Sequence, residues 1–221
     1  MKRLPEKEVM DDETQVIAYA KADFAGVNQA FVGRLLAAHP GAARGSIIDL
    51  GCGPADIPIR LAQAAPEAKV TAVDASAPMI VLAKRAVAKA KLEARVTLVE
   101  GYLPGLPLPD GGFDVVVSNS LLHQLPDPAA FWGEVKRLVR PGGAVFVMDL
   151  FRPASEAEAR RIVEAAAAGE DPVLKEDFYN SLLAAFSLEE VAAQLAAAGL
   201  PFAPTQASER HLVVSGVPPR L

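Results

Sequence analysis

The chain has 221 residues, of which 51% are hydrophobic and 22% are charged, a composition typical of a globular protein with a large apolar core. This length fits one α/β domain with a modest extra element better than two full domains. The net charge of −5 argues against a nucleic-acid partner, because proteins that grip a phosphate backbone usually carry a stripe of Lys and Arg. The single cysteine, Cys52, excludes an internal disulfide and a cysteine-rich metal site, and it fits a reducing compartment.

The first residues, MKRLPEKEVMDDE, lack the apolar segment of a secretory signal. No stretch approaches the ~18 uninterrupted apolar residues of a membrane span. We therefore expect a cytoplasmic protein without a membrane partner. Residues 1–40 are predicted to be mostly helical and, because they precede the first predicted strand, to form a cover over the sheet. Their apolar positions are Val16, Tyr19, Ala20, Phe24, Phe31 and Leu35.

The middle of the chain alternates strand and helix patterns. The order β-α-β-α-β predicts a parallel sheet with helices on both faces. Ser76 and Asp127, the latter followed by Pro128, are predicted helix N-caps, and residues 141–143 (Pro-Gly-Gly) are a predicted turn. The predicted strands are 46–50, 69–73, 95–99, 113–118 and 144–150, and the helices between them cover 57–65, 77–90 and the residues after Asp127.

The last third of the chain has a different pattern. Ser187 to Glu190 form a capping box that begins a helix, and Gly199 is expected to end it. Residues 211–215 are predicted to be the final strand. We expect one domain over residues 1–221, with a cofactor-binding core at 46–150 and substrate-side elements at 151–221.

The clearest motif is Asp49-Leu50-Gly51-Cys52-Gly53, which stands between a predicted strand and a predicted helix. Glycines in such a turn let the backbone bend tightly and approach a ligand closely. Asp74 ends the next predicted strand, 21 residues after Gly53, close to the ~20 expected for a carboxylate that binds ribose hydroxyls. The spacing predicts a site for a nucleoside-bearing cofactor at the carboxyl edge of the sheet.

Two carboxylates discriminate between such cofactors. A dinucleotide site has the pattern Gly-x-Gly-x-x-Gly, with pyrophosphate at the helix N-terminus. Here Asp56 occupies the third glycine position and Asp49 lies just before the loop, and both would repel a pyrophosphate. S-adenosylmethionine (SAM) has no phosphate and carries an ammonium and a sulfonium. Charge therefore favours SAM and disfavours an NAD(P)-dependent oxidoreductase.

The segments DLGCGPADIPIRLA and VTAVDASAPMIVLAKR resemble motif I and the following motif of class I SAM-dependent methyltransferases. EGYLPGLPLPDGGFDVVVSNSLLHQLPDPAAFWGEVKRLVRPGG resembles their later motifs. The resemblance covers roughly residues 46–150 and is specific as a set. It implies a Rossmann-like α/β fold whose seven-stranded sheet is mostly parallel with an antiparallel last strand. The most similar general type is the small-molecule methyltransferases that include the quinone C-methyltransferases.

The resemblance also implies roles for single positions. The glycine loop would line the methionine part of SAM, Asp74 would take the ribose hydroxyls, and Ala75 and Met79 would border the adenine. Many members have Asp after the glycine of the third strand, where it accepts from the adenine amino group, but here Tyr102 follows Gly101. The implied cofactor-binding residues are Asp49, Gly51, Cys52, Gly53, Asp74, Ala75, Met79, Tyr102, Leu103, Asn119 and Ser120.

His123 is the candidate general base. Methyl transfer is an in-line displacement in which positioning can supply much of the catalysis, and a base is needed only when the acceptor is protonated. His123 follows the fourth predicted strand, near the expected methyl group, and a structural role in its loop is the alternative. His39 and His211 are interpreted as structural.

Candidate substrate-binding residues flank this edge of the sheet. Arg152 follows the fifth predicted strand and could recognise an anionic substrate or pin a carbonyl or carboxylate within the fold. Tyr179 and Asn180 could line an acceptor pocket that Tyr19 and Phe24 close from the other side, although aromatic residues at such spacing also pack in cores.

The leading functional hypothesis is SAM-dependent methyl transfer to the oxygen, nitrogen or carbon of a small organic acceptor. The alternative is a non-catalytic SAM-binding module or partner subunit with the same fold. No metal site is expected.

Overall fold

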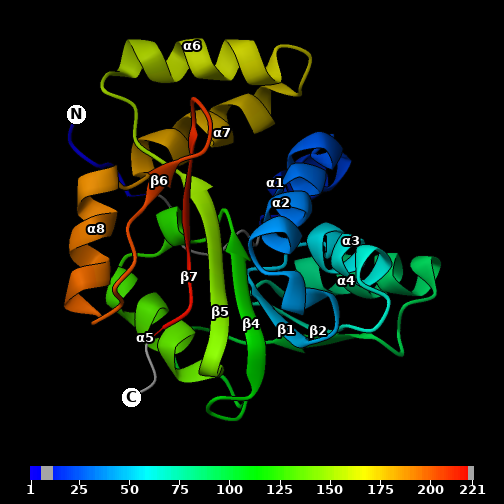
Figure 1. The fold of residues 1–221 in the computed structure, drawn as a ribbon. Helices are drawn as coiled ribbons and strands as arrows, with labels where there is room; N and C mark the ends of the chain where they lie inside the picture. The colour runs from blue at the N-terminus through cyan, green and yellow to red at the C-terminus, as the bar shows by residue number, and fades with distance from the viewer. Residues whose placement is uncertain (6–11, 219–221) are drawn as a thin grey trace.

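The structure, a computed structural model, describes residues 1–5 and 12–218. Its described part contains a seven-stranded sheet in the order β3-β2-β1-β4-β5-β7-β6 (Figure 1). The strands are β1 (Ser46–Leu50), β2 (Lys69–Asp74), β3 (Val96–Glu100), β4 (Phe113–Asn119), β5 (Val139–Leu150), β6 (Thr205–Gln206) and β7 (His211–Gly216).

The first five strands pair in parallel, and β7 runs antiparallel to both β5 and β6. The predicted α/β fold, mostly parallel with an antiparallel last strand, is confirmed. β6 is missing from the prediction because two residues are too few to show a pattern.

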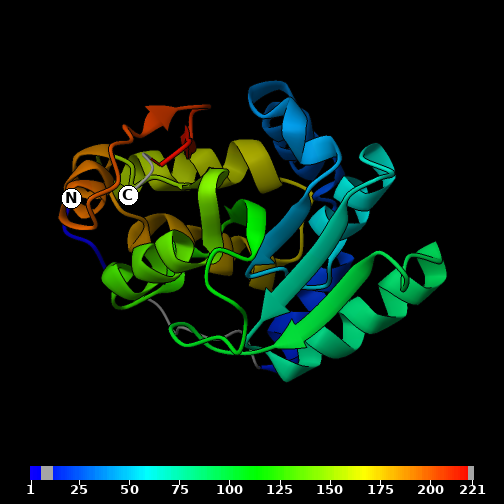
Figure 2. The same cartoon turned by 60° about the horizontal axis from the view of Figure 1, so that its bottom comes forward.

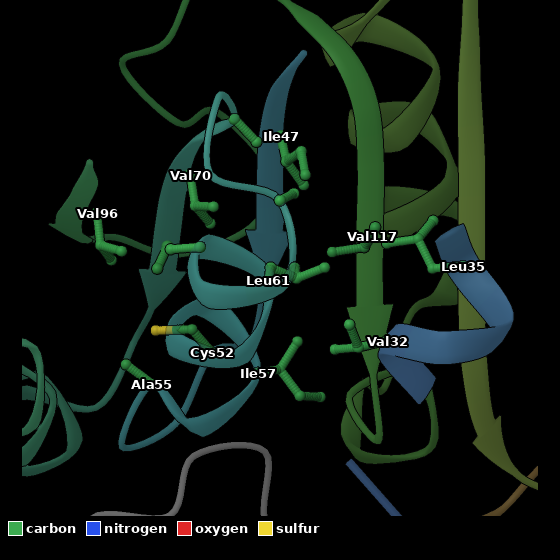
Figure 3. Packing of buried hydrophobic residues seen from close by; sticks show 14 of the residues in the cluster. Val32, Leu35, Ile47, Cys52, Ala55, Ile57, Leu61, Val70, Val96 and Val117 are labelled. Atoms are coloured by element: carbon green, nitrogen blue, oxygen red, sulfur yellow. The ribbon is translucent and has the colours of Figure 1, made fainter. Parts of the chain in front are cut away.

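Helices cover both faces of the sheet because neighbouring residues of a strand point to opposite sides. Ile47 of β1 packs in a cluster with α2 (Ala25–Ala38), α3 (Asp56–Ala64) and α4 (Ala77–Ala90). Figure 3 shows this layer, in which Leu35 and Leu61 lie against Val117. Ile48 packs on the other face with α5 (Pro128–Leu138) and α8 (Leu188–Ala197). The turned view of Figure 2 shows β1, β2 and β3 side by side, with α4 along β3.

The predicted helix caps are present. Ser76 Oγ accepts from Met79 N at 3.3 Å and Asp127 Oδ1 accepts from Ala129 N at 2.9 Å. Ser187 and Glu190 form the capping box of α8. Each cap satisfies backbone N–H groups that have no partner within the helix, and the cap of α4 fixes where the chain leaves β2.

The predicted Pro-Gly-Gly turn is wrong, because residues 141–143 lie within β5. The register against β4 jumps from Phe113↔Val139 to Val115↔Ala144, so the intervening residues form a bulge rather than a turn before the strand. Gly143 is required there, because a Cβ would lie 2.8 Å from the carbonyl oxygen of Asp114.

Two helices between β5 and α8 are missing from the prediction. They are α6 (Glu156–Ala167) and α7 (Pro172–Ala184), and they lie beyond the carboxyl end of β5 (Figure 1). Asp171 caps α7 by accepting from Val173 N at 2.8 Å. The signal was available, because Asp171-Pro172 repeats the Asp-Pro pattern that identified the start of α5.

The predicted N-terminal cover divides into two parts. α2 belongs to the core, since Phe31, Val32 and Leu35 are buried against the sheet. α1 (Glu13–Lys21) packs instead against α4 and α7. Only α1 and the beginning of α2 therefore face the carboxyl edge of the sheet, and residues 6–11 of the predicted cover lie outside the described part of the chain.

Candidate active site

A cavity of about 510 Å³ opens at the carboxyl ends of the parallel strands. This edge, where the order of strands reverses between β1 and β4, is where α/β sheets bind ligands. One part of the cavity is lined by the ends of β1, β2 and β4, and the other by α6, α7 and the residues that begin β7. The first part is here called the cofactor half and the second the acceptor half.

The glycine loop forms the floor of the cofactor half. Gly51 and Gly53 have φ angles of +79° and +51°, which L side chains rarely adopt. The amides of Gly51 and Cys52 both donate to the carbonyl of Val73 (2.9 and 2.8 Å), and this ties the loop to the end of β2. Tyr19 Cε1 lies 3.9 Å from the position that a Cβ of Gly53 would take, so α1 covers the loop closely.

Asp74 stands at the end of β2, beside this loop. Its Oδ2 accepts from the amide of Gly53 at 2.7 Å and its Oδ1 accepts from the amide of Ser76 at 2.8 Å. Burial raises the pKa of Asp74, and these backbone hydrogen bonds act in the opposite direction. Each carboxylate oxygen keeps a further lone pair, so the side chain can accept from two neighbouring hydroxyls.

Asp49 and Asn119 give the strongest indication that this site binds a cationic ligand. Asp49 is 1% exposed, and among the described residues neither of its carboxylate oxygens has a hydrogen-bond partner. The amide oxygen of Asn119 is also buried without a partner among these residues. Burial, with a contribution from Asp74, raises the pKa of Asp49 to about 8. Buried acceptors without donors are rare and costly. Their surroundings therefore fit a ligand that brings its own ammonium, as SAM does.

The remaining residues implied for the cofactor lie around the same half. Ala75, Met79, Tyr102, Leu103 and Ser120 all line the cavity. Tyr102 is 61% exposed, so its ring borders the mouth of the site and provides no carboxylate for an adenine amino group. Cys52 lines a smaller adjoining pocket with Asp49 and packs in the core beside Ala55 (Figure 3), where burial raises the pKa of its thiol.

His123 lines the cavity from η2 (Leu122–Gln124) and forms a pair with Asp149 at the end of β5. The distance between His123 Nδ1 and Asp149 Oδ1 is 2.6 Å, and both residues are buried. The backbone amides of Leu122 and Leu150 also donate to this carboxylate (both 2.7 Å). An acceptor-only carboxylate fixes the proton of a neutral imidazole on Nδ1, which makes Nε2 the basic nitrogen of the ring.

Arg3 holds the segment that carries His123. Its guanidinium donates to the carbonyls of His123 (2.8 Å) and Leu125 (3.1 Å) and lies 3.9 Å above the ring of Phe186. This contact spans 120 residues of sequence, and no local pattern could have predicted it. Arg3 therefore holds the η2 segment in place through its backbone carbonyls.

Three predicted substrate residues lie away from the cavity. Arg152 donates to the carbonyl of Ala185 and to Glu190, so it takes the structural role that was its alternative. The hydroxyl of Tyr179 donates to Glu156 at 3.3 Å, and its ring packs under Arg160. α7 presents residues 174, 177, 178 and 181 to the cavity, the i, i+3, i+4, i+7 face of a helix, which turns Tyr179 and Asn180 elsewhere. Tyr19 and Phe24, whose ring centroids are 4.8 Å apart, do line it.

Residues of the acceptor half were missed at the start of β7. His211, interpreted as structural, lines the cavity together with Arg210. The topology contained the signal: β7 is antiparallel to β5, so its first residues lie at the same edge as the carboxyl ends of the parallel strands. On α7, Asp177 also lines the cavity and accepts from Gln15 Nε2 of α1 at 2.9 Å.

Within residues 1–5 and 12–218, no helix is long and apolar enough to cross a membrane. The same residues include no group of three or more His, Cys, Asp or Glu side chains arranged to hold a metal ion.

Sequence comparisons agree with this geometry. A family model described as a methyltransferase domain matches residues 47–143. The 27-O-demethylrifamycin SV methyltransferase of Amycolatopsis mediterranei is 32% identical over 171 residues, which cover 76% of this chain and 58% of that protein. The demethylmenaquinone methyltransferase of Thermus thermophilus is 34% identical over 107 residues, 48% of each protein. The chain thus spans about half the length of these curated relatives.

Solved structures share the fold. A SAM-dependent methyltransferase from Aquifex aeolicus matches with a TM-score of 0.67 at 18% identity, over 91% of this chain and 96% of that chain. The [4+2]-cyclase SpnF matches with a TM-score of 0.73 at 13% identity, over 100% of both chains. Such low identities establish the fold alone. Residues 47–143 thus match a methyltransferase domain, and the sheet that they form has the fold of SAM-dependent methyltransferase structures.

Proposed function

We propose that this protein transfers the methyl group of SAM to a small organic acceptor. The observation that carries the proposal is a pair of side chains, Asp49 and Asn119, whose buried oxygens have no partner among the described residues and which lie beside the glycine loop. Asp74 accepts from the same loop at Gly53. Asp49 would hold the ammonium of the cofactor, with Asn119 accepting from the same group, and Asp74 would accept from the ribose hydroxyls. When bound, SAM supplies an electrophilic methyl group on a sulfonium.

His123 is the proposed general base. Nε2 of His123 would take the proton that the acceptor loses on methylation. Asp149 keeps the imidazole in the tautomer that can receive it and stabilises the imidazolium that results. The products are the methylated acceptor and S-adenosylhomocysteine.

The whole cavity, at about 510 Å³, has the size of a small-molecule site. The curated relatives reported above are named 27-O-demethylrifamycin SV methyltransferase and demethylmenaquinone methyltransferase. These features support a small organic acceptor. The free thiol of Cys52 supports our further proposal of a reducing, cytoplasmic setting.

Calorimetric titration tests the first requirement of the proposal, which is that the protein binds SAM. We expect SAM and S-adenosylhomocysteine to bind and NAD not to bind, since Asp49 and Asp56 disfavour a pyrophosphate. Binding of SAM without methylation of any member of a broad acceptor panel would support the non-catalytic module instead. Binding of NAD with no response to SAM would rule out both.

A further inference from the structure

The acceptor half contains an unassigned donor pair at the start of β7. Arg210 and His211 both line it, and their backbone is held firmly. The amide of Phe151 donates to the carbonyl of Arg210 at 3.1 Å, and the amide of Arg210 donates to Ser208 Oγ at 3.2 Å. The two side chains are therefore presented by a fixed turn at the sheet edge.

The guanidinium of Arg210 is a half-buried cation without a counter-ion in the described structure. Its Cζ lies 5.6 Å from the centroid of Phe178, which lines the same cavity from α7. Glu209 opposes the lowering of the pKa of Arg210 by burial, but Glu209 faces solvent, with its side chain 75% exposed beside Arg161. The cation is thus desolvated at a ligand-sized cavity and stacked near an aromatic face.

The hydrogen bonds around Ser208 fix the tautomer of His211. Ser208 Oγ accepts from the amides of Arg210 and His211 (3.2 and 3.0 Å), which occupy its two lone pairs. Its own proton is therefore the one shared with His211 Nδ1 at 2.9 Å. Burial, with a contribution from Arg210, lowers the pKa of His211 to about 4, so the ring is neutral at pH 7. A neutral ring that accepts at Nδ1 carries its proton on Nε2 and is a donor there.

We infer that the methyl acceptor carries a carboxylate, bound by the guanidinium of Arg210 and the Nε2–H of His211, on a planar apolar body packed against Phe178. The planar fork of Arg matches the geometry of a carboxylate. A phosphate dianion fits less well, because Glu170 and Asp177 also line the cavity and would repel the second charge. The inference rests on the proposed methyl transfer only for the role of acceptor, since binding can be measured without turnover.

The test uses the full chain saturated with S-adenosylhomocysteine and probes of equal shape and different charge. We expect 4-hydroxybenzoate, or the two-ring 6-hydroxy-2-naphthoate, to bind at least about tenfold more tightly than its uncharged carboxamide. Arg210→Gln should abolish that preference and Arg210→Lys should retain part of it. The matched control Arg161→Gln removes an exposed arginine from the neighbouring surface and should leave the preference intact.

Affinity for S-adenosylhomocysteine, measured for each variant, reports on the fold and on the proposed function separately. This affinity should stay the same in all three variants. If the wild type does not bind S-adenosylhomocysteine, the proposed function is contradicted, but the result says nothing about Arg210. Equal binding of acids and amides, no binding of either acid, tighter binding of 4-hydroxyphenyl phosphate, or an undiminished preference in Arg210→Gln would each overturn the carboxylate inference.

Discussion

Asp49 is placed where a carboxylate destabilises the ligand-free protein. Within the described part of the chain it is buried with no hydrogen-bond donor, and the ionisable groups that face it there are Asp74, the thiol of Cys52 and the phenol of Tyr19. None of these is a cation. Burial, followed by contributions from Asp74 and other carboxylates, raises the pKa of Tyr19 to about 12, so it too stays neutral. The site is thus prepared for a positive charge that the ligand must bring.

The pH dependence of stability follows from this arrangement. The pKa of Asp49 is about 8 in the folded chain and about 3.9 in an unfolded one. Between these values the folded state holds a proton that the unfolded state has released, so the contribution of Asp49 to the free energy of unfolding falls as pH rises from about 4 to about 8. Asp49→Asn should remove this fall and, at pH 8, stabilise the ligand-free protein by on the order of 1–3 kcal/mol. Urea unfolding at pH 5 and pH 8 measures both effects.

The same variant should bind S-adenosylhomocysteine more weakly, since it loses the charge that faces the ammonium. Greater stability together with lower affinity is the expected signature. Parallel pH profiles for wild type and variant would contradict the assigned pKa, and unchanged affinity would contradict the assigned partner.

His123 should matter to the chemical step and little to cofactor binding. With an acceptor that must lose a proton, His123→Ala is expected to lower the single-turnover rate by ~10²–10⁴-fold, while affinity for S-adenosylhomocysteine hardly changes. Asp149→Asn, which keeps the shape of the side chain, should shift the pH profile of the rate because the imidazolium loses its stabilising charge. Wild-type rates for His123→Ala at every pH would assign His123 a structural role.

The residues that sequence reasoning could reach differ in kind from those it missed. Gly51, Gly53 and Asp74 follow predicted strands directly, so local pattern placed them at the sheet edge. Asp149 ends a predicted strand in the same way, although its pairing with His123 was not predicted. The cation of the acceptor half, Arg210, lies in a turn that no such pattern placed. Only the pairing of β7 with β5 brings Arg210 and His211 to that edge, and no local pattern encodes a pairing.

At the level of elements, α1 and the N-cap residue of α2, Phe24, should respond most to ligand binding. Tyr19 and Phe24 line both pockets beside the glycine loop, so a bound cofactor would pack against them. Cleavage by chymotrypsin after these two aromatic residues should therefore slow when S-adenosylhomocysteine is added. Equal cleavage with and without the ligand would mean that α1 rests on α4 and α7 independently of the site.

Among the other elements, prediction succeeded where a strand was continuous and apolar, or where a capping residue stood before a helix. It failed at β5, where the bulge at residues 140–143 imitates a turn, and at α6 and α7. α7 contacts α6, α1 and η2, and an element covered on several sides shows no single apolar stripe.

For the molecule as a whole, the sequence determined best the succession of strands and helices along the chain and the parallel character of the sheet. Runs such as residues 115–117 are fully apolar because β4 is buried on both faces, and alternation of such runs with helices leaves few arrangements. The acceptor half of the cavity, in contrast, forms where α6 and α7 meet Arg210 and His211 at one edge of the sheet, and the sequence pattern did not predict that meeting.

The hydrogen bond from Gln15 to Asp177 joins α1, which covers the cofactor loop, to α7, which walls the acceptor half. A ligand that steadies either helix therefore prepares the site of the other ligand, and by thermodynamic reciprocity each must raise the affinity of its neighbour by the same factor. We expect heterotropic cooperativity of about fivefold or more between S-adenosylhomocysteine and 4-hydroxybenzoate, and Gln15→Ala should abolish it while leaving the separate affinities in place. If SAM and the acceptor bind cooperatively, the reactive sulfonium spends less time bound alone in a site that is open to water.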